Sequence, residues 1–291
     1  MIGIALAIVS AATSALSVVL VRRHSTHSSA FNISLIISWV GMLILWPLAL
    51  VLTDFAAINI VSILLFALSG VLTPGFVRLL YYQGMKKLGA PVNSSLFSTY
   101  PLYTSLLAVF FLSEILAPGN WVGIFLVFLG GILVEWSSRE ISIEGERYRG
   151  RNLIYPLMGG LALGFGSILR KYALDLFNAP VLGVAVAYSF SLLPFVVMFA
   201  FSESTRKEIS LKRDLRLFWV AGIGQAITWM LSFYALSYAE VSVVTPLLSI
   251  EPVFVALFAY LYLRKVEKIS AKLLVSIALT VLGVVLVTAK F

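Results

Sequence analysis

The sequence contains no cysteine, and only 12% of its 291 residues are charged, whereas 60% are hydrophobic. The absence of cysteine excludes disulfide bonds and thiolate metal sites. The shortage of charge excludes an ordinary water-soluble domain, in which about a quarter of the residues are charged. The sequence also lacks the HExxH and GxSxG motifs, and its only histidines are His24 and His27. We therefore expect no metal, no cofactor and no enzymatic activity.

Ten apolar runs, most of them close to 20 residues long, are separated by polar segments. A helix of about 20 residues crosses the roughly 30 Å hydrocarbon core of a bilayer. The runs lack the period-two alternation of barrel strands, so we expect an all-α polytopic membrane protein. The predicted helices cover Ile2–Leu20, Phe31–Leu52, Ile58–Gln83, Pro91–Leu112, Trp121–Trp136, Leu153–Tyr172, Pro180–Phe201, Leu217–Tyr238, Val241–Leu263 and Ala271–Ala289.

The first run begins at Ile2 with no basic segment before it and no cleavage site after it. This pattern favours a retained helix over a signal peptide. The formal net charge of +8 is divided among short loops, so it bears on membrane orientation. We therefore exclude nucleic acid as a partner.

Alternate loops differ in basic residues: 17 Lys and Arg lie on one side, and Arg170, Lys171 and Lys290 make 3 on the other. Arg78, which falls inside a predicted helix, completes the total of 21. Because cytoplasmic loops are richer in Lys and Arg, the first set is expected in the cytoplasm and both termini outside.

Proline lies well inside four predicted helices, as Pro74, Pro101, Pro194, and Pro246 with Pro252. A proline frees the carbonyl four residues earlier and permits a kink, which suggests a cavity-lining or moving core. The alternative is that proline is simply more frequent in membrane helices than in soluble ones.

The polar segment 137–152 divides the chain near its middle, and the two halves align weakly with each other. The offset drifts from 149 to 153, and the matches place Ser98 and Pro101 on Ser249 and Pro252, Glu114 on Glu267, and Gly130 on Gly283. We expect two five-helix repeats, residues 1–136 and 153–291, joined by the linker 137–152. A repeat with an odd number of crossings ends on the side of the membrane opposite to its start. The second copy therefore begins on the other side, and the two repeats are inverted. Inverted repeats place a substrate site near the midplane and expose it alternately to each side.

These residues resemble the drug/metabolite transporter superfamily, specifically its ten-helix EamA-type branch. The resemblance covers nearly the whole chain and is carried by Tyr82-Gln83-Gly84 through Pro101 to Ser113-Glu114, by Tyr234-Ala235-Leu236 through Pro252 to Glu267, and by Gly130 and Gly283. It implies that the fifth and tenth helices lie at the periphery of a central cavity and that a small solute such as an amino acid, drug or sugar is moved, commonly outward. It also implies that both termini face the cytoplasm, against the charge count. The first helix carries only Ser10, Thr13, Ser14 and Ser17 where four-helix multidrug relatives have a glutamate, so proton-coupled cation export through that position is not implied.

Glu251 is the sharpest functional signal, because a charge inside hydrocarbon is costly and is a functional candidate by default. It lies midway along the predicted helix Val241–Leu263, directly before Pro252 and opposite Tyr100 in the repeat alignment. We interpret it as a carboxylate that binds a proton or a substrate ammonium group. The alternative is a protonated carboxyl that bonds a carbonyl freed by proline.

Arg78 is the second charge inside a predicted helix and lies near Lys86 and Lys87. We favour a side chain that snorkels to the interface, although Arg78 is also a candidate counter-charge for Glu251.

Aromatic and polar side chains on several predicted helices suit a mostly apolar pocket with a few orienting groups. Our candidates for substrate binding or coupling are Trp39, Tyr100, Tyr188, Gln225 and Trp229, together with Glu251 and Arg78. Tyr82, Tyr234, Trp46, Trp121 and Trp136 are assigned instead to interfacial aromatic belts.

The sequence thus predicts a secondary transporter of a small metabolite that works by alternating access, as an exporter in the plasma membrane and with possible proton coupling. Its expected partners are the substrate, protons and the lipid bilayer, and its expected state is a monomer or a homodimer. A lipid transporter or scramblase of the same fold is the main alternative, and an intramembrane enzyme is a weaker one.

Overall fold

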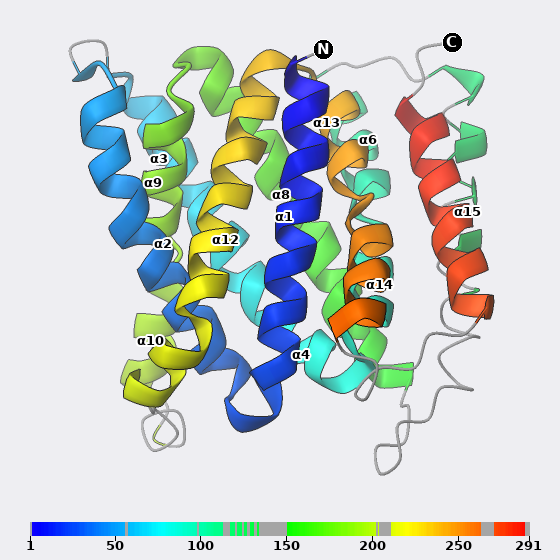
Figure 1. The fold of residues 1–291 in the computed structure, drawn as a ribbon. Helices are drawn as coiled ribbons and strands as arrows, with labels where there is room; N and C mark the ends of the chain where they lie inside the picture. Colours follow the sequence, from blue (N-terminus) through cyan, green and yellow to red (C-terminus); the bar gives the residue numbers. More distant parts are fainter. Residues whose placement is uncertain are drawn as a thin grey trace.

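The computed structural model describes residues 2–55, 58–97, 99–112, 117–119, 121–123, 125–126, 129–130, 133, 150–201, 203, 211–262 and 271–288. Within these ranges the regular elements are helices, most of them running across the molecule in alternating directions (Figure 1). Seven segments of the described chain are long and apolar enough to cross a membrane, and Tyr100–Phe111 and Leu274–Gly283 are shorter apolar helices. The polytopic helical class is therefore confirmed.

The first half contains α1 (Ile2–His24), α2 (Ala30–Leu52), α3 (Ile60–Gly70), the π-helical turn η3 (Val71–Phe76), α4 (Val77–Leu88), α5 (Ala90–Phe97) and α6 (Tyr100–Leu112). The second half contains α8 (Ile154–Leu176), α9 (Pro180–Phe190), α10 (Leu193–Phe201), α12 (Leu211–Tyr238), α13 (Val241–Leu248), α14 (Glu251–Tyr262) and α15 (Ala271–Thr288). Short 3₁₀ turns cover Ser25–His27 and Gly150–Leu153. The predicted helix Trp121–Trp136, most of the predicted linker 137–152, and Glu114 and Glu267 lie outside the described residues or largely so.

The four predicted helices with a proline well inside them, in which we expected a kink, are each divided in the structure. The divisions are α3–η3–α4, α5–α6, α9–α10 and α13–α14. In the last three, a proline is the second residue of the following helix: Pro101, Pro194 and Pro252. At that position the missing proline N–H has no intrahelical acceptor, so a new helix starts without loss where a continuous one would be broken.

Local side-chain chemistry sets several other helix ends. The Ser29 hydroxyl accepts a hydrogen bond from the Asn32 N–H and caps α2, while the Asn59 side chain accepts from the N–H groups of Val61 and Ser62 and caps α3. Gly89 follows α4 with φ of 83°, a left-handed conformation that favours glycine. These caps fix where the chain turns between crossings.

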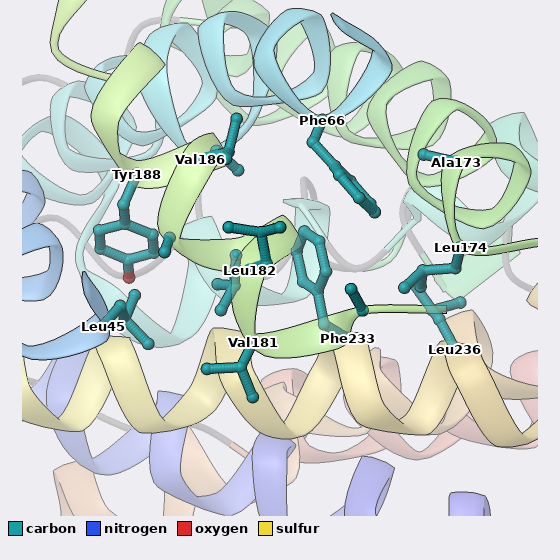
Figure 2. Packing of buried hydrophobic residues seen from close by; sticks show 14 of the residues in the cluster. Leu45, Phe66, Ala173, Leu174, Val181, Leu182, Val186, Tyr188, Phe233 and Leu236 are labelled. Carbon is teal, nitrogen blue, oxygen red and sulfur yellow. The ribbon is translucent and has the colours of Figure 1, made fainter. Parts of the chain in front are cut away.

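One hydrophobic cluster joins α2, α3, α8, α9 and α12 (Figure 2). The Phe66 and Phe233 rings lie 6.0 Å apart, and Gly183 fits beside them because a Cβ there would come within 2.8 Å of Phe66. Gly41 makes room in the same way for the Tyr188 ring, which a side chain at position 41 would displace. The cluster thus fixes Tyr188, whose hydroxyl lies at the edge of the apolar core.

The basic helix ends gather on one face of the molecule, the lower one in Figure 1, where α1 and α4 end and α12 and α15 begin. They include Arg22, Arg23, Lys86, Lys87, Lys212, Arg213 and Arg216. On the opposite face α1 begins and α15 ends (Figure 1). Lys171 pairs with Asp175 at 2.8 Å and lies 3.4 Å from the carbonyl of Leu236, near the end of α12, the end remote from the basic face. The distribution agrees with the alternation of the loops on which the predicted orientation rests.

Candidate functional site

A cavity of about 110 Å³ lies among helices of both halves. Its walls come from α1, α4, α5 and α6 of the first half and from α8, α12, α13 and α14 of the second, with Pro74 of η3. Most of the lining is apolar or aromatic, as in binding sites for small organic molecules. The polar and charged groups that line it are Ser10, Ser14, Arg78, Tyr81, Tyr82, Tyr100, Ser167, Arg170, Gln225, Thr228, Ser232, Thr245 and Glu251.

Glu251 enters the cavity from the first residue of α14, directly after the turn that divides α13 from α14. The Ser14 hydroxyl of α1 donates to one carboxylate oxygen at 2.9 Å, and the Tyr81 hydroxyl of α4 donates to the other at 2.8 Å. Both donors belong to the first half, so the carboxylate connects the halves. The Gln225 amide lies 3.4 Å from the Ser14 hydroxyl and extends this network to α12.

Arg78 lies in the first turn of α4, at the cavity wall, and only 5% of it is exposed. Its guanidinium donates to the Ser38 hydroxyl at 2.6 Å and to the Tyr188 hydroxyl at 2.8 Å, and it lies 4.8 Å from the centre of the Tyr188 ring. The expectation that Arg78 snorkels to the interface is wrong, because η3 directs the start of α4 into the interior.

Arg170 of α8 is the second buried guanidinium at the cavity, with 3% of the residue exposed. It donates to the Gly166 carbonyl at 3.0 Å and to the Ser167 hydroxyl at 2.8 Å. The guanidinium carbon Cζ of Arg170 lies 4.7 Å from the centre of the Trp229 ring and 5.6 Å from the centre of the Phe233 ring. Stacking on aromatic faces stabilises a guanidinium while its edge stays available for hydrogen bonds.

Two aromatic rings connect these cations. The Tyr188 ring, in contact with Arg78, lies 6.5 Å from the Trp229 ring in an edge-to-face arrangement, and Trp229 supports Arg170. One side of the site is thus a continuous series of cation, two rings and cation. We call these four residues the Arg–aromatic ladder.

Tyr100 begins α6 and is 4% exposed. Its hydroxyl donates to the Thr245 carbonyl, in the last turn of α13, at 2.7 Å. The Ser249 N–H also donates to this carbonyl, at 3.1 Å, so the Tyr100 hydroxyl is its second donor and fixes α6 against the break that precedes Glu251.

The structure brings together most of the predicted site residues. Glu251, Tyr100, Trp229, Gln225 and Arg78 line the cavity, and Tyr188 lies behind Arg78 in the ladder. Trp39 does not belong to this group, since it is 44% exposed and absent from the lining. The helical rotation that directs Ser38 at Arg78 turns Trp39 outward.

Two further sequence-based placements are corrected. Tyr82, assigned to an interfacial belt, is 2% exposed and lines the cavity. Arg170 was counted with Lys171 among the basic residues at the end of the predicted helix Leu153–Tyr172, but α8 continues to Leu176 and Arg170 lines the cavity. The apolar Leu174 and Leu176 after the basic pair carried the signal that the helix extends further.

Ser14, Tyr81 and Arg170 are the contributors that sequence reasoning did not select. A serine in an apolar run and a tyrosine beside another tyrosine have no distinctive spacing, so only the fold identifies the carboxylate that they bind. Within the described ranges, no three His, Asp or Glu side chains gather closely enough to hold a metal ion.

Curated relatives match most of the chain at low identity. A chloroplastic WAT1-related protein of Arabidopsis thaliana is 23% identical over 78% of this chain, and uncharacterized transporters of Synechocystis and Archaeoglobus fulgidus are 23% and 26% identical over 78% and 82% of it. The matched part spans 54% of the plant protein's length, and 71% and 81% of the other two.

The solved crystal structure of another protein superimposes on 99% of this chain, over 95% of the length of that protein's chain, with a TM-score of 0.65. At 15% identity it shows that the fold is shared and nothing about substrate. The family model described as "EamA-like transporter family" matches residues 1–136 and again 151–289. Together these segments contain every described residue that lines the cavity. This chain belongs to the EamA-like transporter family.

Proposed function

We propose that this chain is a secondary transporter that moves a small metabolite through the cavity by alternating access. The observation that carries the proposal is a cavity with charged and aromatic walls, enclosed by helices of both halves of a membrane-spanning chain. Charges placed within a bilayer are costly and usually mark a pathway for a solute or a proton. Membership of a transporter family agrees with this reading.

The repeat pattern supports alternating access. The family model matches the two halves separately, and the breaks before Pro101 and Pro252 occur at corresponding positions of the sequence alignment. Broken helices at a site between repeats are a recurring feature of transporters whose halves rock against each other. In our proposal the repeats are inverted, and their movement exposes the cavity first to one side and then to the other.

Glu251 is the proposed proton site. Its carboxylate already has one hydroxyl donor on each oxygen, and both donors come from the other half. Movement of the halves therefore changes the environment of this carboxylate, which couples protonation to the side from which the cavity is open. The other titratable groups that line the cavity are Arg78, Tyr81, Tyr82, Tyr100 and Arg170.

The proposed orientation rests on the charge distribution, against the orientation that the resemblance implies, and the proposed direction of transport rests on the resemblance. The basic face is proposed to be cytoplasmic, the membrane to be the plasma membrane, and the net movement to be outward. The functional unit is proposed to be a monomer or a homodimer.

Reconstitution of the purified chain into liposomes tests the proposal. Vesicles are loaded with a mixture of amino acids, amines, organic acids and sugars, and the released solutes are followed by mass spectrometry with and without a pH gradient. We expect the time-dependent release of a small subset of solutes from vesicles that contain the protein.

Protein-free vesicles and vesicles with heat-denatured protein are the controls. Equal release of every solute would indicate a leak, and release of none, with no solute-induced rise in melting temperature, would contradict a transport function.

A further inference from the structure

The two buried guanidiniums have no acidic partner within the described residues. Neither Arg78 nor Arg170 takes part in an ion pair there, and each uses two of its five N–H donors in hydrogen bonds to neutral groups. A buried cation without an anionic partner is destabilising, because the loss of hydration is not compensated. The described residues around these guanidiniums therefore leave their positive charge uncompensated.

Glu251 is the only acidic residue among the described residues that line the cavity, and it does not pair with either arginine. Its two oxygens accept from Ser14 and Tyr81, and no contact of 4.0 Å or less joins it to either arginine. When Glu251 is ionised, the two arginines and the carboxylate give the cavity a net charge of +1. When Glu251 is protonated, the net charge of the cavity is +2.

We propose that the transported solute is an organic anion with a carboxylate or similar planar acidic group, attached to an aromatic or apolar body. The inference rests on the proposed transport function and names the class of its substrate. A monoanion makes the site neutral when Glu251 is ionised, whereas a cation would add positive charge to a cavity that already has an excess.

Arg170 is the recognition group that this geometry favours most. The Trp229 and Phe233 rings hold its guanidinium plane, while Gly166 and Ser167 occupy part of its edge. The remaining edge donors are preorganised for a bidentate contact with a carboxylate. Tyr81, Tyr82, Phe97, Tyr100 and Trp229 supply aromatic surface for the body of the solute.

The closing experiment measures direct binding to the purified full-length chain in nanodiscs, with four probes of one shape. They are 3-phenylpropionate, phenylalanine, 3-phenylpropanol and 3-phenylpropylamine, which are anionic, zwitterionic, neutral and cationic. We expect 3-phenylpropionate to bind at least about tenfold more tightly than each of the other three, since charge-assisted contacts are the strong ones. The comparison uses the wild-type chain, so it does not depend on a variant that folds.

Arg170→Gln should weaken 3-phenylpropionate about tenfold or more, and Lys171→Gln is the matched control. Lys171 is the next residue of the same helix and is not among the lining residues; its ammonium pairs with Asp175 and lies 3.4 Å from the Leu236 carbonyl, so its loss should leave binding within about twofold.

Tighter binding of the amine or of phenylalanine, binding of none of the four, or an unchanged affinity in a folded Arg170→Gln protein would overturn the organic-anion assignment. Transport of the amine would overturn it while leaving the transport function intact.

Discussion

The breaks α5–α6 and α13–α14 are built alike and carry different chemistry. In each, the second residue of the following helix is a proline, Pro101 or Pro252, and the first residue directs its side chain across to the other half. Tyr100 donates its hydroxyl to a main-chain carbonyl of α13. Glu251 offers a carboxylate to hydroxyls of α1 and α4.

The difference separates architecture from chemistry. A proline-started helix with a cross-half hydrogen bond is common to both places, so it belongs to the construction of the site. The ionisable group occurs at one of the two, so the proposed proton chemistry is asymmetric between the halves. A corresponding contrast holds for the cations, since Arg78 and Arg170 reach the cavity from α4 and α8, which do not occupy equivalent places in the two halves.

The largest effect is expected from preventing the halves from moving. A Cβ on Gly3 of α1 would lie 3.4 Å from the Cβ of Tyr238 at the end of α12, just below the separation found in disulfides. It would also lie 3.1 Å from the Ala239 Cβ and 3.2 Å from the Ala235 carbonyl oxygen, so α1 and α12 must separate by a few tenths of an ångström to admit it. Oxidised Gly3→Cys/Tyr238→Cys protein should lose transport completely, and reduction should restore it, because the cross-link holds one face closed.

The absence of native cysteine removes background cross-linking in this experiment, and each single variant serves as a control. Wild-type flux in fully cross-linked protein would exclude rocking of the halves.

The second prediction compares the first residues of the two breaks. Glu251→Gln keeps the shape and much of the hydrogen bonding but removes titration, so flux driven by a pH gradient should fall by at least about tenfold. Tyr100→Phe removes one bond to a carbonyl and should reduce flux by about two- to fivefold. Both are measured in liposomes at matched protein content, with expression and melting temperature as folding controls. Equal losses in the two variants would show that the breaks do not differ in role.

The membrane helices were predictable from the sequence because the bilayer imposes their length and composition. Internal prolines also indicated the four helices that are divided, but they did not show whether a proline would bend its helix or end it. Pro47 lies inside α2, which remains one helix, whereas Pro101 and Pro194 follow complete breaks. Tertiary packing decides between the two outcomes, and an apolar run carries little record of it.

Site residues were predictable where their presence in hydrocarbon was itself costly. Glu251 and Arg78 stand out for that reason, and the structure places both at the cavity. Arg170 was missed because, beside Lys171 and near the end of the predicted helix Leu153–Tyr172, it was counted for membrane orientation and not as a charge inside hydrocarbon. Trp39 was selected for its depth, but depth does not reveal the direction of a side chain, and Trp39 faces outward.

The third prediction concerns the two donors that hold Glu251. Tyr81→Phe and Ser14→Ala each remove one hydrogen bond to the carboxyl group, which corresponds to about a three- to tenfold loss of coupled flux. The double variant should show non-additive losses, because both donors act on one group. Strictly additive small losses would indicate that neither donor acts through Glu251. Thr13→Ala is the matched control, since its hydroxyl bonds a carbonyl of its own helix, outside the cavity lining.

The smallest effect on transport is expected at Asp214, a buried carboxylate outside the cavity. It accepts from the Ser28 hydroxyl at 2.6 Å, the Asn32 amide at 2.8 Å and the Arg213 guanidinium at 3.2 Å, and so joins the start of α12 to the α1–α2 connection. Asp214→Asn should cost about 1–3 kcal/mol of stability, because hydrogen bonds to a charged acceptor are lost. The expected readout is a melting temperature lower by several degrees, with near wild-type flux per folded molecule. Asp175→Asn is the control, since Asp175 is a 54% exposed partner of Lys171 and surface pairs contribute little. A loss of flux in folded Asp214→Asn protein would show that this carboxylate, like Glu251, takes part in the transport cycle.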